Sequence, residues 1–262
     1  MSHIKTTILH IIYIHEVMPM QILNLVLHSN TPIYNEMYAI TNEHYKKYTN
    51  VKTVYYLFSD IEKEYEYDSE TNILQIKGIE TFIPGQHKTI KAFEFFRDDF
   101  RNYDYVVRPN ASSIVNFDIL CNELNELTNN NNPMNYGGLW MHIADGSTSP
   151  DYGIIDNRFA NLNYASGTCI ILSKNAFAVL MDGLHLYDDS AVDDVSIGDF
   201  IHKHTEYTLT HLTKVVFTTE DHFLKNMHNN ANDKLKEYIL FRNRSNNRYH
   251  DIEIMNYIAK NL

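Results

Sequence analysis

The stretch Asp-Asp-Val-Ser-Ile-Gly at residues 193–198 follows an apolar, small-residue run, Tyr-Ala-Ser-Gly-Thr-Cys-Ile-Ile-Leu-Ser, at residues 164–173. The run predicts a buried strand that carries a glycine turn, and the two carboxylates predict the start of a helix reaching about His204. Two like charges this close raise the pKa of one of them, as a general base at neutral pH requires. Asp193 and Asp194 are therefore candidate catalytic residues. The competing interpretation is that they only cap the helix.

Outward from this motif, strands alternate with helices along the chain. Gln21 to His28 and Val51 to Phe58 are apolar or β-branched, and helical spacing covers Tyr34 to Tyr48 between them, which predicts a βαβ unit with parallel strands. Further strands are expected at Ile73 to Ile76, Tyr103 to Arg108, Tyr136 to Ile143, Thr168 to Leu172 and Lys214 to Phe217. Further helices are expected at Lys88 to Phe100, Val115 to Leu127, Lys174 to Met181 and Asp251 to Asn261, with exposed segments at Glu62 to Tyr67 and Ala144 to Asn161. This alternation predicts an α/β fold.

The order of these segments resembles the galactosyltransferase and Fringe-type (β-1,3-galactosyltransferase-like) glycosyltransferases. In that family a strand with Ser-Gly, here Ser166-Gly167, and a later Ser precedes Glu/Asp-Asp-Val-x-x-Gly. The resemblance spans about residues 20 to 250. It implies a GT-A-type, Rossmann-like fold with a mostly parallel central sheet and helices on both faces. It also implies inverting transfer of a sugar from a nucleotide-diphosphate donor, a UDP-sugar, to a glycan or glycoconjugate hydroxyl, with Asp194 as the base.

Polar and basic side chains at the ends of the expected strands form the candidate substrate site. Ligands of open parallel sheets bind beyond the carboxyl ends of the strands, and in the resembled fold the first two ends hold the base and ribose. The donor-binding candidates are Ser29, Asn30, Asp60, Lys88, Arg108, Asn110, Ser112, Arg242, Arg244 and Arg248, and the acceptor-binding candidates are Trp140, Ser166 and Gly167. Alternatives remain open, because strand-end polar residues are ordinary turn residues, tryptophan is typically a core residue, and the arginines also suit a solvated face that pairs with Asp251 and Glu253.

The segment after Arg108 departs from the family pattern. Family members place Asp-x-Asp or Asp-Asp-Asp here, and those carboxylates hold manganese. Asn110, Ala111, Ser112 and Ser113 stand at this place, and they are poor ligands for a hard dication. We therefore expect either transfer without Mn²⁺, with lysines and arginines stabilising the departing diphosphate, or loss of catalysis. No metal ligand is predicted except His222, which follows the last strand as a histidine ligand does in the resembled enzymes.

Composition limits the function. A length of 262 residues with 44% hydrophobic content suits one domain, expected over residues 21–262 after an uncertain segment 1–20. The net charge of −11 argues against nucleic-acid partners and anionic membrane surfaces. The apolar run at residues 8–14 is too short to span a bilayer, so we expect no transmembrane segment and a soluble, cytoplasmic protein.

Three functions are compatible with these patterns. The first is a nucleotide-sugar-dependent glycosyltransferase. The second is a non-catalytic protein that binds sugars or nucleotides on a degenerate transferase fold. The third is a metal-dependent phosphodiesterase that uses the acidic pairs Asp98-Asp99 and Asp188-Asp189, although these pairs lack convergent spacing. The donor sugar, the acceptor and the oligomeric state stay open.

Overall fold

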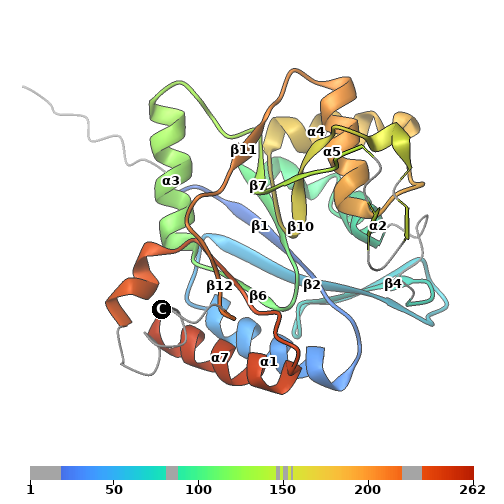
Figure 1. The fold of residues 1–262 in the computed structure, drawn as a ribbon. Helices are drawn as coiled ribbons and strands as arrows, with labels where there is room; N and C mark the ends of the chain where they lie inside the picture. The colour runs from blue at the N-terminus through green and yellow to red at the C-terminus, as the bar shows by residue number, and fades with distance from the viewer. Residues whose placement is uncertain (1–18, 81–87, 146–147, 150–152, 155, 220–231) are drawn as a thin grey trace, which may run out of the picture.

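A computed structural model describes residues 19–80, 88–145, 148–149, 153–154, 156–219 and 232–262. Within these residues, eight strands form a central sheet in the order β11-β7-β10-β5-β1-β2-β4-β3 (Figure 1). The strands are β1 (Ile22–Leu27), β2 (Val51–Ser59), β3 (Tyr65–Asp68), β4 (Ile73–Lys77), β5 (Tyr105–Pro109), β7 (Tyr136–His142), β10 (Asn163–Ser173) and β11 (Leu209–His211).

The sheet is mostly parallel and its strand order reverses at one point. Strands β5, β1, β2 and β4 pair in parallel, which confirms the predicted parallel pair β1 and β2. From β1 the chain proceeds to β2 on one side, whereas β5 returns to the other side of β1. Strand β10 is antiparallel to both β5 and β7, so its first residues lie at the carboxyl ends of β1 and β5. These ends are the switch point at which ligands of such sheets bind.

Helices cover both faces of the sheet, as predicted. Along each strand, alternate side chains point to opposite faces. Leu25 and Tyr56 pack with α2 (Lys88–Phe95), α4 (Lys174–Asp182) and α5 (Asp193–His204). Val26 and Tyr55 pack with α1 (Pro32–Tyr45) and α3 (Phe117–Asn129) on the other face. Each large apolar side chain so buried contributes roughly 1.5–3 kcal/mol, so both faces stabilise the sheet.

A second, three-stranded sheet joins the C-terminal part of the chain to the strand-end segment 110–113. It consists of β12 (Val215–Phe217), β13 (Leu240–Arg242) and β6 (Ser113–Val115), with Arg242 opposite Ser113. The C-terminal helix α7 (Arg248–Asn261) packs against α1, beside which it lies in Figure 1. Smaller elements are β8 (Thr148–Ser149), β9 (Gly153–Ile154), η1 (Asp99–Asn102), η2 (Asn157–Phe159), η3 (Leu184–Leu186) and η4 (Asn232–Glu237).

Several expected boundaries are wrong. Helix α2 ends at Phe95, and the Arg-Asp-Asp run that follows leads into η1, because aspartate favours caps and turns over helix interiors. Residues 65–68 form the edge strand β3, whose alternate tyrosines pack on Phe95. Val115 belongs to β6 rather than to a helix, since it pairs with Leu240. The short strands β11 and β13 were not predicted.

The two cysteines are free, with Cys169 buried and Cys121 half-buried. In the described part of the chain, no helix combines the length and the apolar character needed to cross a bilayer.

Candidate functional site

The Asp-Asp-Val-Ser-Ile-Gly motif brings the first turn of α5 against β10. A Cβ atom at Gly198 would lie 2.4 Å from the Cβ of Tyr164, so only glycine allows this close approach. A Cβ at Gly167 would likewise lie 3.0 Å from Asp194 Oδ2. The two glycines thus let Asp194 of α5 reach the backbone of β10 at the switch point of the sheet.

Asp194 is half-buried and is held by backbone groups. Its Oδ2 accepts a hydrogen bond from Gly167 N at 2.6 Å, and its Oδ1 accepts one from Val195 N at 2.9 Å. Burial and then the negative charge of Asp193 raise the pKa of Asp194 to about 6, against the opposing effect of these hydrogen bonds and of Arg108. A carboxylate of this pKa is ionised at neutral pH and still basic enough to accept a proton.

Asp193 is oriented by a buried arginine. Its Oδ2 lies 2.6 Å from Nη2 of Arg108 and also accepts the hydroxyl of Thr89. Burial alone would lower the pKa of Arg108, but Asp193, Tyr56 and Asp194 together outweigh burial and raise it. Both carboxylates are therefore half-buried and fixed, Asp193 by side chains and Asp194 by the backbone N–H groups of Gly167 and Val195.

The guanidinium of Arg108 forms its hydrogen bonds with other groups of the protein. Its Nε donates to the hydroxyl oxygens of Tyr56 at 3.1 Å and Thr89 at 3.3 Å. Its Nη1 donates to Gly167 O at 2.5 Å and Asn110 Oδ1 at 3.1 Å. Arg108 thus holds Asp193, which compensates its charge, and donor binding by Arg108 stays a prediction. The sequence pattern did not identify Tyr56 as a site residue. Thr89 lies at the start of the helix expected from Lys88, but no role was predicted for it.

Lys88 lies at the same edge. Its Nζ donates to His28 O at 2.8 Å and to Glu80 Oε1 at 2.5 Å, and burial lowers the pKa of Lys88 despite Glu80. Burial and Lys88 lower the pKa of His28 to about 4, so this imidazole is neutral at neutral pH. Within the described residues the Nδ1 of His28 has no hydrogen-bond partner. Sequence reasoning treated His28 only as a strand end.

The predicted base- and ribose-binding residues lie at the carboxyl ends of β1 and β2. Asn30 and Asp60 are exposed and Ser29 is half-buried. Asn30 Oδ1 accepts a hydrogen bond from Asn35 Nδ2 at 3.1 Å. Asn110 is closer to the carboxylates, since its N–H donates to Thr168 O at 3.2 Å and it bridges Leu27 of β1. Donor binding by these residues stays a prediction.

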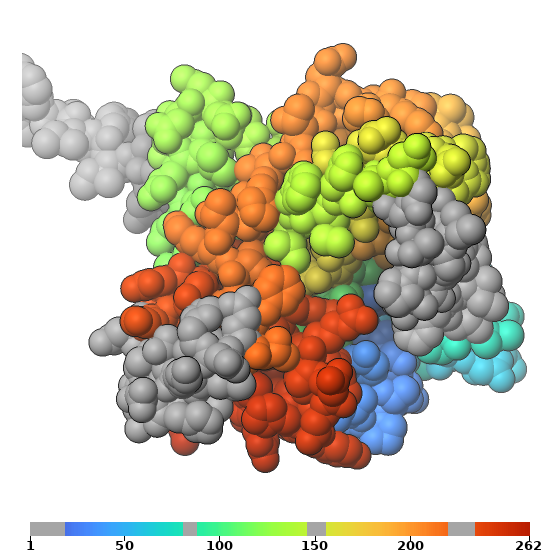
Figure 2. Space-filling view, in the orientation of Figure 1, coloured from blue at the N-terminus to red at the C-terminus, as the bar shows by residue number. Residues whose placement is uncertain are grey.

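The predicted arginine cluster separates into three environments. Arg242 is buried and donates from Nη1 to Ser112 Oγ at 2.5 Å. Arg248 pairs with Asp251 at 2.5 Å and lies over the ring of Tyr34, which matches the alternative of a salt-bridged face. Arg244 is exposed. Figure 2 shows the C-terminal segment, in red, beside the blue α1 region, to which Tyr34 belongs.

Trp140 is a surface residue rather than a core residue. It is 49% exposed near the carboxyl end of β7 and stacks on His142 at 6.0 Å between ring centroids. Its strand partner is Ala165, which comes directly before Ser166-Gly167. The Oγ of Ser166 contacts Thr168 Oγ1 at 3.1 Å. The exposed indole is therefore available to stack on a sugar ring, near the strand edge that holds Gly167.

The residues at 110–113 do not fit a divalent cation. The side-chain oxygen of Asn110 accepts from Arg108 and that of Ser112 accepts from Arg242, so each neutral oxygen already faces a positive charge. The described residues contain no group of three His, Cys, Asp or Glu side chains able to hold a metal ion. His222 lies outside the described residues. The donor set thus disagrees with the manganese site that the family resemblance implies.

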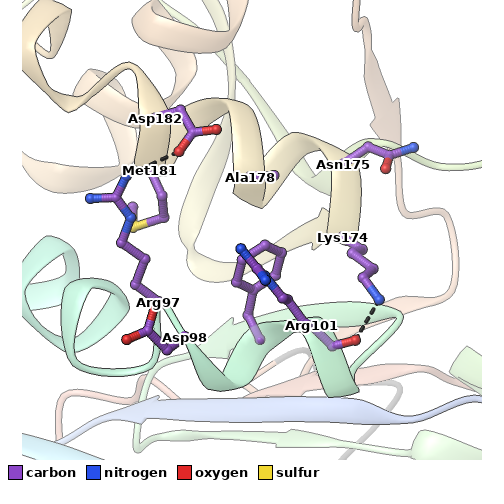
Figure 3. Close-up of a pocket in the computed structure, with 9 residues that line it drawn as sticks. Arg97, Asp98, Arg101, Lys174, Asn175, Ala178, Met181 and Asp182 are labelled. Atoms are coloured by element: carbon purple, nitrogen blue, oxygen red, sulfur yellow. Dashed lines mark hydrogen bonds and ion pairs between the residues drawn. The ribbon is translucent and has the colours of Figure 1, made fainter.

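A cavity of about 470 Å³ lies between η1 and α4, beside the start of β5 and the end of β10 and so at the opposite ends of these strands from Gly167 (Figure 3). Arg97 pairs with Asp182 there at 3.0 Å, and Lys174 donates to the carbonyl oxygen of Arg101. Asp98 lines this cavity, far along the sheet from Asp194, and Asp188 pairs with Arg158 at 3.0 Å. The acidic pairs of the phosphodiesterase hypothesis therefore do not converge on one site.

The sequence matches no protein-family model and has no significant match among curated proteins. A glycosyltransferase involved in the glycosylation of the major capsid of PBCV-1 is similar in structure, with 9% identity, 90% of this chain and 98% of that chain covered, and a TM-score of 0.43. The apo structure of the bifunctional glycosyltransferase WbbM is 15% identical, with 90% of this chain and 49% of that chain covered and a TM-score of 0.46. A 4-diphosphocytidyl-2C-methyl-D-erythritol synthase from Anaerococcus prevotii DSM 20548 is 12% identical, with 74% of this chain and 89% of that chain covered and a TM-score of 0.41. Identities and TM-scores as low as these do not show which activity this chain has.

Proposed function

We propose that the protein is a glycosyltransferase of the galactosyltransferase and Fringe-type kind, which transfers a sugar from a UDP-sugar to a hydroxyl of a glycan or glycoconjugate. The observation that carries the proposal is Asp194, a carboxylate at the switch point whose pKa is raised to about 6. A carboxylate that is ionised yet basic, at the edge where ligands of such sheets bind, suits the removal of a proton from a sugar hydroxyl.

In the proposed reaction the acceptor oxygen attacks the anomeric carbon from the face opposite the diphosphate. The hydroxyl proton passes to a carboxylate oxygen of Asp194, and the bond between the anomeric carbon and the diphosphate oxygen breaks with its electron pair on the diphosphate. Asp193, held by Arg108 at 2.6 Å, keeps a negative charge beside Asp194 and so favours proton uptake. The exposed ring of Trp140 offers a stacking surface for the acceptor.

The test is release of nucleoside diphosphate from a panel of nucleotide sugars in the presence of hydroxyl acceptors. Asp194→Asn is expected to lower transfer by about a hundredfold or more, the scale of a general base, while donor binding is kept. Asp182→Asn is the matched control, because Asp182 pairs with Arg97 beside the cavity between η1 and α4. Donor binding without transfer by the parent protein would favour the non-catalytic binding protein, and full activity of Asp194→Asn would make Asp194 only a helix cap.

A further inference from the structure

Arg242 is a buried cation whose side-chain contacts are neutral. It is 9% exposed, and its Nη1 donates to Ser112 Oγ at 2.5 Å and to Ser113 Oγ at 3.5 Å. Within the described residues no carboxylate forms an ion pair with Arg242. Burial, and then the charges of Arg244 and Arg248, lower the pKa of Arg242 to about 10, while Tyr34 and Asp251 act in the opposite direction. The guanidinium is charged at neutral pH, and Asp251, the carboxylate that acts on it, is already paired with Arg248. A buried charge without a counter-ion is costly, and an anionic ligand would compensate it.

The position of Arg242 connects it to Asp194. Strand β13 places Arg242 opposite Ser113, whose hydroxyl contacts Thr168 O at 3.3 Å. Thr168 follows Gly167, the residue that donates to Asp194 Oδ2 at 2.6 Å. Arg242 therefore lies at the carboxyl end of β5, on the same strand edge as the proposed base.

The other candidate cations at this edge are already neutralised or open to solvent. The neutralised ones pair with carboxylates at 2.5 to 2.6 Å, namely Arg108 with Asp193, Lys88 with Glu80 and Arg248 with Asp251. Arg244 is exposed, so a charge interaction made by it is screened by water. Arg242 alone among these candidates combines burial, positive charge and neutral partners.

Arg242 contacts the segment at which the family resemblance implies a metal ion. Ser112 stands where the resembled family has a metal-binding carboxylate, and its hydroxyl oxygen accepts from Arg242. A dication on this oxygen would be repelled by the guanidinium. A guanidinium fork binds two phosphate oxygens at once and neutralises part of their charge, as a metal ion does.

We propose that Arg242 binds the diphosphate of the nucleotide donor and replaces the divalent metal ion at this site. The proposal rests on the proposed function, because it assigns the donor subsite of the same transferase. Its consequence is that pyrophosphate and nucleoside diphosphates bind with the same affinity in the presence and absence of a chelator.

The experiment measures binding of inorganic pyrophosphate, UDP and uridine by calorimetry, each with excess EDTA and with Mn²⁺. Arg242→Met removes the charge and keeps most of the buried volume, and Arg242→Lys keeps the charge without the fork. We expect Arg242→Met to weaken pyrophosphate and UDP about tenfold or more, with uridine unchanged and Arg242→Lys intermediate. Arg97→Met is the matched control, because Arg97 pairs with Asp182 beside the cavity between η1 and α4. Circular dichroism and the uridine affinity establish that each variant is folded.

The results separate this proposal from the proposed function. Pyrophosphate binding that needs Mn²⁺, that is absent in the parent, or that is equal in the parent and Arg242→Met overturns the role of Arg242, whether or not transfer is observed. Chelator-resistant, Arg242-dependent binding without transfer of any bound nucleotide sugar upholds the role of Arg242 and refutes the transferase. If Arg242→Met is unfolded, Arg242→Lys decides, since it is expected to weaken pyrophosphate binding and to leave uridine binding unchanged.

Discussion

The raised pKa of Asp194 predicts that the candidate base destabilises the fold at neutral pH. The rise from the usual 3.8 to about 6 corresponds to about 3 kcal/mol, at roughly 1.4 kcal/mol for each pKa unit. Between these two pH values the folded state holds a proton that the unfolded state has lost, so the free energy of unfolding falls as pH rises. Below about pH 4 both states are protonated, and the penalty disappears.

Asp194→Asn removes this titration. The amide keeps one of the two backbone hydrogen bonds, and the loss of the other costs roughly 1 kcal/mol at every pH. We therefore expect the variant to be less stable than the parent near pH 4 and more stable by about 2 kcal/mol near pH 7. The measurement is urea unfolding of both proteins at a series of pH values. A stability difference that does not change with pH would refute the raised pKa.

Three further results are expected. The kcat/KM of transfer should fall about tenfold for each pH unit well below pH 6, because Asp194 becomes protonated there; a profile that stays level to about pH 4 would exclude it as the base. Gly198→Ala should lower stability by roughly 1–3 kcal/mol and reduce transfer, since its Cβ would meet Tyr164 at 2.4 Å; an unchanged urea midpoint would contradict this packing. Trp140→Ala should raise the KM for the acceptor and change stability by less than about 0.5 kcal/mol, because its ring is 49% exposed; an unchanged acceptor KM would remove Trp140 from the site.

Much of the fold was predictable because its strands bury both faces. The apolar runs of β1, β2, β5 and β10 and the helical spacing of α1 and α4 gave the correct α/β class, since continuous apolar strands and amphipathic helices have different periods. The three-residue strands β11 and β13 carry too short a pattern to be recognised. Strand β13 forms because β6 and β12 flank it, which is a tertiary cause that local sequence does not contain.

The candidate site was predictable only where residues are adjacent in sequence. Asp193 and Asp194 were found as a pair at a helix start. Their environment depends on Arg108 and Gly167, which the chain brings together from separate strands. The sequence pattern could not rank the five basic candidates, because it does not reveal which basic side chain has a carboxylate beside it. The contrast between Arg248 and Arg242 is visible only from their partners.

The small sheet of β12, β13 and β6 sets the order in which the site is completed during synthesis. Arg242 reaches Ser113 across 129 residues of sequence, whereas the central sheet has most of its strands once β10 ends at Ser173. At the usual 5–20 residues per second, a ribosome needs roughly 3–14 s to proceed from Ser173 to Arg242. We therefore expect Asp194 to be in place in the nascent chain before Arg242 has been synthesised. The unfinished protein would then contain the proposed base but not the arginine proposed to bind the diphosphate.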